Sequence, residues 1–347
     1  MITPDSQNVY FSIIIPVFNK EKYINRAISS IINQIFQDFE IIIVNDASID
    51  NTMNIINEFS KQNSKITVLN HQKNESQHVA RLNGVTVASG KYILFLDGDD
   101  YFIEKALSIL FETIQKNPGY DFYEFGYIRK PSGETIYPSL SRDDRFLTFF
   151  NKENVPAHTM WNKVYDAKLI KKAFIDIEKA YINYAEDIYE SIIIAFYTEK
   201  FLNLEKVIIN YQVGSGTSTT YKNYDQTIES LQSIQKVIRL VENFIQKKKK
   251  NVNTYNLNYR LLTLVINTYF NIQKNKEDKR KLFHVLPTFF NITLIMDFMF
   301  ELEESKRNIL NSKYFRLVIF LLKPLRKIKR ILSRNNIRSN INNLHLL

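Results

Sequence analysis

The sequence predicts an α/β protein in which a mostly parallel sheet lies between helices, followed by a helical C-terminal module. Three observations indicate this architecture. Between residues 11 and 116, apolar runs typical of buried strands alternate at short intervals with segments of helical periodicity. From residue 224 onward the periodicity is only helical, in about five segments. The 347 residues suffice for one substantial core and a smaller module, so we predict domains 1–221 and 222–347.

The positions of the helices and strands are predicted from the spacing of apolar residues and from the turn residues between them. In the first part we expect strands at residues 11–19, 40–48, 66–70 and from 92, and helices at about 21–35, 51–61, 76–88 and 103–116. Ser48 or Asp50 is expected to cap the second of these helices. After residue 119 we expect a strand at 121–129, a loop at 131–144, helices at 161–173 and 186–199, and two short strands within 201–213.

Composition excludes several classes of site and suggests a compartment. The chain has no cysteine, so a disulfide framework, a thiolate nucleophile and a cysteine-ligated zinc are excluded. We see no secretory signal pattern and no run of eighteen apolar residues, so we expect a cytoplasmic protein. The net charge of +10 favours an anionic partner. No nucleic acid is expected, because the basic residues are not interleaved with a recognised nucleic-acid-binding fold.

Three carboxylates follow the apolar run that starts at residue 92. Asp97, Asp99 and Asp100 lie at its carboxyl end, where open α/β sheets hold their ligands. Like charges so close are unfavourable unless a cation joins them, and oxygen ligands suit Mg²⁺ or Mn²⁺. We therefore predict that Asp97 and Asp99 bind a divalent metal, with a solvated turn as the alternative. Asp100 is expected to cap the next helix.

A nucleotide would have to be bound without a glycine-rich loop. The chain has eight glycines and none before Gly84, so neither a GxGxxG turn nor a P-loop follows the first strand. Asp46, at the end of the second strand, can accept a hydrogen bond from a base N–H. The alternative is that Asp46 shapes the turn.

An ordered set of motifs over roughly residues 10 to 220 resembles family 2 glycosyltransferases of the GT-A fold, and is most similar to bacterial transferases that build capsule or lipooligosaccharide chains. The set comprises Pro16 with Phe18 and Asn19, Val44 to Asp46 with Ser48 and Asp50, Arg81 with Asn83 and Gly84, Gly90 with Tyr92, Phe95 with Asp97 to Asp100, Trp161 to Lys163, and Glu186 with Asp187. Single motifs of this kind are weak, but their order is specific.

The resemblance implies roles for the site residues. It places Pro16, Phe18, Asn19 and Arg81 at the nucleotide, with Asp46 at uracil. It assigns Asp97 and Asp99 to the metal and the diphosphate, with Asp99 the more direct ligand. Asp187 becomes the general base that deprotonates the acceptor hydroxyl, and Glu186 orients it or contacts the acceptor. Without the resemblance, Glu186 and Asp187 would be interpreted as the acidic first turn of a helix. Arg81 would be interpreted as a solvated surface residue.

The sequence departs from the commonest family pattern at three positions. Asn45 and Ala47 replace the usual Asp and Gly around Asp46, and Phe18 stands where Tyr is frequent. Phe18 can still stack on a base but cannot donate a hydrogen bond. These changes bear on which base the chain prefers, uracil or guanine.

Other residues carry open alternatives. His158 would either contact the metal or phosphates or be structural. Trp161 and Lys163 would either form an acceptor wall and a phosphate contact or belong to the core and the solvated surface. Residues 214–218 would be either a loop closing over the donor or an interdomain linker.

Together these observations predict a metal-dependent, inverting glycosyltransferase that moves a sugar from a UDP-sugar to a hydroxyl of a glycan or lipid-linked glycan acceptor on the bacterial surface. A sugar nucleotidyltransferase and a non-catalytic scaffold are the alternatives. Residues 315–322 are apolar apart from Arg316, and seven basic residues follow, namely Lys323, Arg326, Lys327, Lys329, Arg330, Arg334 and Arg338. This tail is expected either to bind an anionic membrane surface on the inner face of the cell membrane or to pack on the helical module.

Overall fold

The structure is a computed structural model that describes residues 9–138, 145–151, 157–214 and 224–272. Its strands are β1 (Phe11–Val17), β2 (Phe39–Asn45), β3 (Ile66–Asn70), β4 (Tyr92–Phe95), β5 (Tyr101–Phe102), β6 (Phe122–Lys130), β7 (Thr135–Ile136), β8 (Lys163–Asp166) and β9 (Phe201–Gln212). Its helices are α1 (Ile24–Ile32), α2 (Thr52–Gln62), α3 (Gln77–Val87), α4 (Ala106–Lys116), α5 (Arg145–Thr148), α6 (Ala167–Phe174), α7 (Glu186–Tyr197), α8 (Tyr224–Lys247) and α9 (Tyr255–Ile272).

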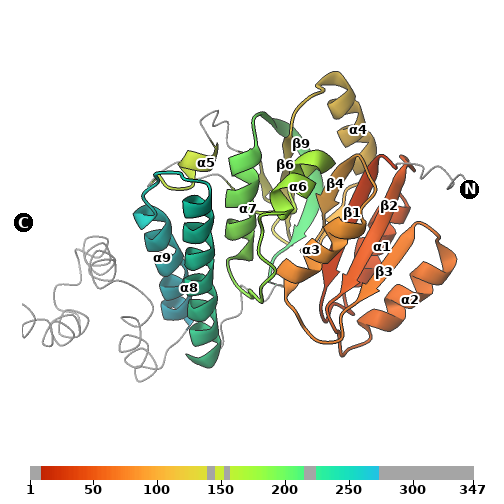
Figure 1. Cartoon of the computed structure of the whole chain (residues 1–347). Coiled ribbons are helices and arrows are strands. Elements are labelled where there is room, and N and C mark those ends of the chain that lie inside the picture. Colours follow the sequence, from red (N-terminus) through yellow and green to blue (C-terminus); the bar gives the residue numbers. More distant parts are fainter. Residues whose placement is uncertain (1–8, 139–144, 152–156, 215–223, 273–347) are drawn as a thin grey trace, which may run out of the picture. The chain divides into compact units, whose positions relative to one another are not determined.

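The strands in the described part of the chain form one mixed sheet with helices on both faces (Figure 1). Its order is β3-β2-β1-β4-β8-β6-β9-β5, with β7 paired to β6. Strands β1 to β4 are parallel, as are β6 and β9, whereas β8 runs antiparallel to β4 and β6. The predicted α/β fold with a mostly parallel sheet is thus confirmed. Because β1, β2 and β4 are parallel, their carboxyl ends meet at one edge of the sheet.

Successive side chains of β1 point to opposite faces of the sheet, and each face is covered by helices. Ile13 and Ile15 belong to a core that includes residues of α1 and α4. Ile14 faces the opposite side, where α3 packs so closely that a Cβ on Gly84 would lie 2.4 Å from a methyl carbon of Ile14. Gly84 therefore brings α3 down onto the sheet, and this places the side chains at the start of α3 near the strand ends.

Two predicted elements in the second part of the sheet are wrong. The helix expected at 161–173 begins only at Ala167, because Lys163–Asp166 pairs as β8 between β4 and β6 and Asp166 then caps α6 by accepting from Lys168 N at 2.7 Å. The two strands expected within 201–213 are one strand, β9, whose pairing with β6 shifts register around Gly126. This register shift interrupts the alternation of apolar and polar residues along β9, which is why the sequence predicted two strands.

The two long helices, α8 and α9, lie side by side, and α8 packs on α7 (Figure 1). Lys247 and Lys248 at the end of α8 bind Asp176 at 2.7 and 2.6 Å, and Phe244 packs edge-on against Phe196. No helix among the described residues is long and apolar enough to cross a membrane. The basic tail after residue 322 and most of the 214–218 loop lie outside the described residues. The predicted domain boundary near residue 221 stays a prediction.

Candidate functional site

The acidic turn after β4 is held by side chains from α3 and from the loop after β1. Asp97 Oδ1 accepts from Gln77 Nε2 at 2.6 Å and lies 3.6 Å from a guanidinium nitrogen of Arg81. Asp99 Oδ2 lies 2.6 Å from Nζ of Lys20. Partial burial, together with the charges of Asp99 and Asp187, raises the pKa of Asp97 to about 6. Both carboxylates of this turn are thus held by cationic or amide side chains from neighbouring elements.

Asp100 does not cap a helix, so that expectation is wrong. Helix α4 begins only at Ala106, after a left-handed Lys105 and with no side-chain cap. Asp100 is instead fully buried, and its Oδ1 accepts from Gln212 N at 2.7 Å, which ties the turn to the end of β9. Its Oδ2 has no hydrogen-bond partner among the described residues. Burial and the charges of Asp97 and Asp99 raise the pKa of Asp100 well above its usual range.

The loops after β1 and β2 are joined by hydrogen bonds at the same edge of the sheet. Asn19 N donates to Ser48 Oγ at 3.0 Å, and Asn19 Oδ1 accepts from Ile49 N at 2.9 Å. Pro16 lies buried within β1, while Phe18 is 37% exposed beside this loop pair. Ser48 or Asp50 is the expected cap of α2. Asp50 accepts from Thr52 N at 3.0 Å, whereas Ser48 accepts from Asn19 N instead.

Asp46 lies at the centre of a hydrogen-bond network and is only 2% exposed. Its carboxylate accepts from Glu75 N at 2.7 Å, from Ser76 N at 2.9 Å and from His71 Nδ1 at 2.7 Å. Asn83 Nδ2 lies 2.8 Å from His71 Nε2. An amide N–H can only donate, so Nε2 accepts and the His71 proton lies on Nδ1, facing Asp46.

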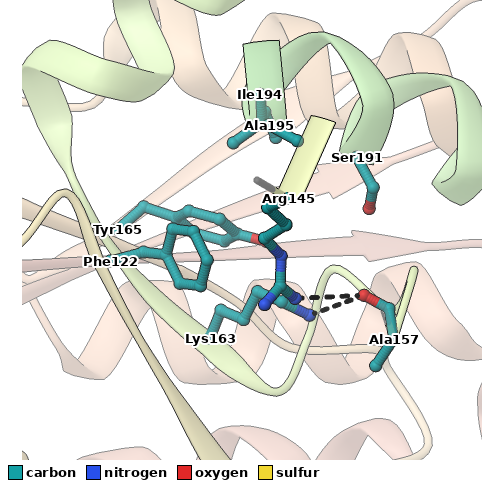
Figure 2. Close-up of a pocket in the computed structure, with 8 residues that line it drawn as sticks. All are labelled: Phe122, Arg145, Ala157, Lys163, Tyr165, Ser191, Ile194 and Ala195. Atoms are coloured by element: carbon teal, nitrogen blue, oxygen red, sulfur yellow. Dashed lines mark hydrogen bonds between the residues drawn. The ribbon is translucent and has the colours of Figure 1, made fainter. Parts of the chain in front are cut away.

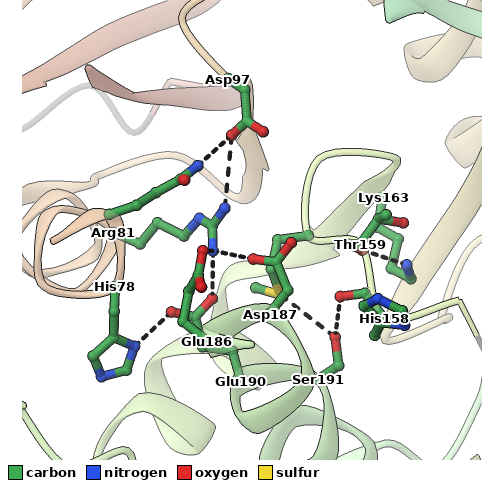
Figure 3. Close-up of polar contacts among 12 residues, drawn as sticks. His78, Arg81, Asp97, His158, Thr159, Lys163, Glu186, Asp187, Glu190 and Ser191 are labelled. Carbon is green, nitrogen blue, oxygen red and sulfur yellow. Dashed lines mark hydrogen bonds and ion pairs between the residues drawn. The ribbon is translucent and has the colours of Figure 1, made fainter. Parts of the chain in front are cut away.

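Arg81 connects the acidic turn to α7 (Figure 3). It is 1% exposed, and its NH1 donates to Asp187 Oδ1 and, at 3.0 Å, to Glu190 Oε2. Burial lowers the pKa of Arg81, but the carboxylates of Asp187, Glu190, Asp97 and Glu186 raise it well above its ordinary value. The structure thus brings Arg81, Asp97 and Asp187 together, as expected of an Arg81 near the strand-end carboxylates, and excludes the alternative of a solvated Arg81.

The acidic pair lies at the start of α7, which follows Ala185 in a left-handed conformation with φ 65°. The Asp187 side chain remains 24% exposed, although Arg81 holds its Oδ1. Burial and the nearby charge of Asp187 raise the pKa of Glu186 to about 8. Glu186 is therefore protonated at neutral pH and can donate a hydrogen bond, whereas Asp187 is oriented by a cation.

Strained backbone gathers around this site. Of the six non-glycine residues with positive φ in the described ranges, Asn19, Ala47, Ser76 and Ala185 adjoin the loops just described. Such conformations persist only where surrounding contacts enforce them, and they cluster at functional sites. Ala47 and Ser76 bear side chains where the conformation favours glycine.

Sequence reasoning missed the residues that support the predicted ones, namely Lys20, His71, Gln77, His78 and Glu190. His78, fully buried, faces Glu190 Oε1 at 2.7 Å and the Glu178 carbonyl at 2.9 Å. Helical spacing is the signal that could have found two of them, because Gln77 precedes Arg81 by four positions and Glu190 follows Glu186 by four.

Two further candidates, Trp161 and His158, have contacts that bear on their alternatives. Trp161 belongs to the core and stacks on Tyr211 at 4.9 Å, which favours the core alternative over an acceptor wall. His158, whose carbonyl accepts from Ser191 Oγ at 2.9 Å, is exposed and lies beyond Asp187 in Figure 3.

Lys163 is buried and donates to the Thr159 carbonyl at 2.6 Å and to Asn162 Oδ1 at 2.8 Å, with Glu124 3.5 Å away. Burial lowers the pKa of Lys163 to about 8. It lines a cavity of about 10 Å³ together with Arg145 and Ser191 (Figure 2). That space is about enough for one water, so Lys163 is neither solvated nor at a substrate-sized pocket.

The residues present fit a divalent cation. Among the described residues no three His, Asp or Glu side chains are arranged to hold a metal by themselves. Mg²⁺ is usually held by one or two carboxylates together with substrate phosphates, and Asp97 and Asp99 match that donor set.

Comparison with known proteins identifies the class of domain. Residues 12–176 match the model of the family described as Glycosyl transferase family 2. This part of the chain is a family 2 glycosyltransferase domain. Residues 1–349 of S. aureus TarS, solved in complex with UDP-GlcNAc, share the fold with a TM-score of 0.55 and 19% sequence identity, over 81% of this chain and 80% of that one.

Two curated relatives are glycosyltransferases of bacteria. Glycosyltransferase GlyA of Streptococcus pneumoniae serotype 4 is 26% identical over 219 residues, which are 59% of this chain and 31% of GlyA. GalNAc(5)-diNAcBac-PP-undecaprenol beta-1,3-glucosyltransferase of Campylobacter jejuni is 37% identical over 110 residues, which are 31% of this chain and 35% of that protein. The chain thus spans about a third of the length of these relatives.

Proposed function

We propose that the protein is an inverting glycosyltransferase that moves a sugar from a nucleoside diphosphate donor, a UDP-sugar, to a hydroxyl of a bacterial surface glycan. The observation that carries the proposal is the position of Arg81 between Asp97 and Asp187. It sets the acidic turn, which suits a diphosphate with its cation, beside a partly exposed carboxylate that suits a reacting hydroxyl. The TarS complex with UDP-GlcNAc and the membership of the domain in family 2 support a UDP-sugar donor.

The donor is proposed to lie along the edge formed by the loops after β1 and β2. Phe18, which is exposed there, would stack on the base, while Pro16 and Asn19 shape the loop that receives it. A carboxylate offers about four lone-pair sites, so Asp46 can accept a base N–H besides the three it already accepts. Asp97 and Asp99 would hold Mg²⁺ or Mn²⁺, which when bound neutralises the charge that develops on the leaving diphosphate.

The chemical step is a single displacement. The acceptor oxygen forms a bond to the anomeric carbon while the bond from that carbon to the diphosphate oxygen breaks, and the diphosphate leaves with the electron pair. The acceptor proton passes to Asp187, a role that its exposure allows and that Arg81 supports by fixing the carboxylate. Glu186, protonated at neutral pH, donates a hydrogen bond to the acceptor. Attack from the face opposite the leaving group inverts the anomeric configuration.

The acceptor is proposed to be a glycan or lipid-linked glycan. The Campylobacter relative, which is named for an acceptor linked to PP-undecaprenol, supports this class. The basic tail would then hold the protein on the inner face of the cell membrane, beside such an acceptor.

The test is the product released from nucleotide substrates by the full-length protein with an acceptor extract. A glycosyltransferase releases UDP from a UDP-sugar, and excess EDTA abolishes the release until Mn²⁺ or Mg²⁺ is restored. Release of pyrophosphate from UTP and a sugar phosphate would instead indicate a nucleotidyltransferase, and no product in either assay would indicate a scaffold. Undiminished UDP release in EDTA would contradict the metal assignment alone.

A further inference from the structure

Glu190 lies one helical turn after Asp187 on α7, and one nitrogen of Arg81 reaches both carboxylates. NH1 of Arg81 donates to Asp187 Oδ1 and, at 3.0 Å, to Glu190 Oε2 (Figure 3). A terminal guanidinium nitrogen carries two hydrogens, so each carboxylate receives one of them. Arg81 Nε has no hydrogen-bond partner among the described residues. The direction in which Arg81 faces Asp187 therefore depends on its contact with Glu190.

The other oxygen of Glu190 is held by His78 from α3. Both residues are fully buried, and Nδ1 of His78 lies 2.7 Å from Glu190 Oε1. Nε2 of His78 lies 2.9 Å from the carbonyl of Glu178. A carbonyl oxygen only accepts, so Nε2 carries a proton, and a second proton lies between Nδ1 and Oε1. Whichever of those two atoms bears the second proton, the pair of His78 and Glu190 is neutral as a whole.

This neutral pair defines what Glu190 does for Arg81. A buried carboxylate is unfavourable unless it is paired and hydrogen-bonded, and His78 meets that need for Glu190. Glu190 therefore does not require the charge of Arg81 for its own compensation, and it offers NH1 an acceptor at a fixed place. His78 and Arg81 are three positions apart on α3, as are Asp187 and Glu190 on α7, so each pair lies on one face of its helix.

We infer that Glu190, held in place by His78, is a positioning residue for the proposed general base: it directs NH1 of Arg81 toward Asp187 and thereby fixes that carboxylate relative to the acceptor hydroxyl. The inference rests on the proposed function and adds two buried residues that touch neither donor nor acceptor. If Arg81 turned, the carboxylate of Asp187 would turn with it. A misplacement of about 1 Å can lower a rate by about 100-fold.

The experiment separates length from charge at position 190 in the full-length protein. Glu190→Gln retains the length, and its amide can accept from Arg81 and donate to Nδ1 of a neutral His78, so both contacts and the net charge of the pair are kept. Glu190→Asp retains the acid but withdraws it from Arg81 by one methylene. The matched control is Tyr189→Phe, which removes a hydroxyl that accepts from Glu178 N at 3.0 Å and leaves the contacts of Arg81 unchanged.

Turnover is followed as UDP release from a saturating UDP-sugar with excess acceptor extract. It is expressed per molecule that binds UDP, as counted by calorimetry, so unfolded protein does not lower the value. Each substitution is also made together with Asp187→Asn, which has no base to position. A structural defect lowers turnover by the same factor in both backgrounds, whereas a positioning defect lowers it only where Asp187 is present.

We expect Glu190→Asp to lower turnover by about 10- to 100-fold while UDP affinity stays within about twofold of wild type. Glu190→Gln and Tyr189→Phe should retain turnover within about threefold, because both leave NH1 of Arg81 with its two acceptors. In the Asp187→Asn background, Glu190→Asp should change the residual turnover by less than about threefold.

The inference is overturned, and the proposed function is not, by wild-type turnover of Glu190→Asp, by a loss of turnover in Glu190→Gln, or by equal losses in both backgrounds. Failure of either Glu190 variant to bind UDP would also overturn it, since Glu190 would then act in folding alone. Wild-type turnover by Asp187→Asn would overturn the proposed base as well. No UDP release by the wild-type protein would overturn the proposed function.

Discussion

The buried Arg81 forms an ion pair with the partly exposed Asp187, and this pair joins α3 to α7. The same guanidinium lies 3.6 Å from Asp97 and 3.0 Å from Glu190, so one side chain spans the acidic turn and the start of α7. Arg81 is 1% exposed and lies within 4.0 Å of four carboxylates, so it supplies counter-charge to all of them. Arg81 is therefore a structural requirement of the site and not only a contact for the donor.

Replacing Arg81 by Met is expected to lower the free energy of unfolding by about 3 to 5 kcal/mol, because breaking a buried ion pair leaves uncompensated charge. Arg81→Lys retains the charge but not the fork that reaches several carboxylates, so its stability should be intermediate. Urea unfolding measures both. The control is Arg129→Met, which removes a largely exposed ion pair with Glu134 and should change stability by less than about 1 kcal/mol. An Arg81→Met protein as stable as wild type would refute this role.

Glu186 is expected to make stability depend on pH. Its pKa in the folded protein, about 8, lies above the ordinary value of 4.5. The folded protein therefore retains a proton that the unfolded chain releases, and stability falls as pH rises from about 4.5 to about 8. Glu186→Gln removes this loss, so its melting temperature should match wild type near pH 4.5 and exceed it increasingly up to pH 8. Melting curves from pH 4.5 to 9 test this, and a pH-independent difference would speak against it.

Ser76 has a φ of 84° at the point where its N–H binds Asp46. Both Ser76→Gly and Ser76→Ala lose the hydroxyl that accepts from Ile182 N, but only Gly adopts this conformation without strain. We expect the Gly variant to be more stable than the Ala variant by about 1 kcal/mol. Within the last turn of α2 the order should reverse, so Ser60→Gly should be less stable than Ser60→Ala. The same order at both positions would contradict the strain.

The basic tail is expected to bind anionic membranes. Each basic residue near such a surface contributes about 1 kcal/mol, so the seven from Lys323 to Arg338 give substantial affinity. Sedimentation with anionic and neutral liposomes should show binding of the full chain to anionic liposomes only, and loss of it in a version ending at Leu322. Equal binding of both versions to both liposome types, or no binding by either, would count against the membrane role.

The strands in the first part of the fold could be predicted from the sequence, because strands buried on both faces are continuous apolar runs, as in residues 41–44 of β2. Strand β8 could not be predicted, because the four residues Lys163–Asp166 are too few to show the alternation typical of a strand. They form a strand only because β4 and β6 lie on either side. Chain order and polar strand ends placed Asp46, Asp97 and Asp99 at one edge. The pairs Lys20–Asp99 and His78–Glu190 join residues 79 and 112 positions apart and depend on packing.

The measurement that tests the central proposal most directly is turnover by Asp187→Asn, followed as UDP release from a UDP-sugar with acceptor present. We expect turnover to fall by about 10² to 10⁴, the usual contribution of a positioned base, while calorimetric UDP affinity stays near wild type. Glu134→Gln, at an exposed position in the turn between β6 and β7, serves as the control with wild-type turnover. Wild-type turnover by Asp187→Asn would contradict the assignment of the base and make Glu186 the next candidate.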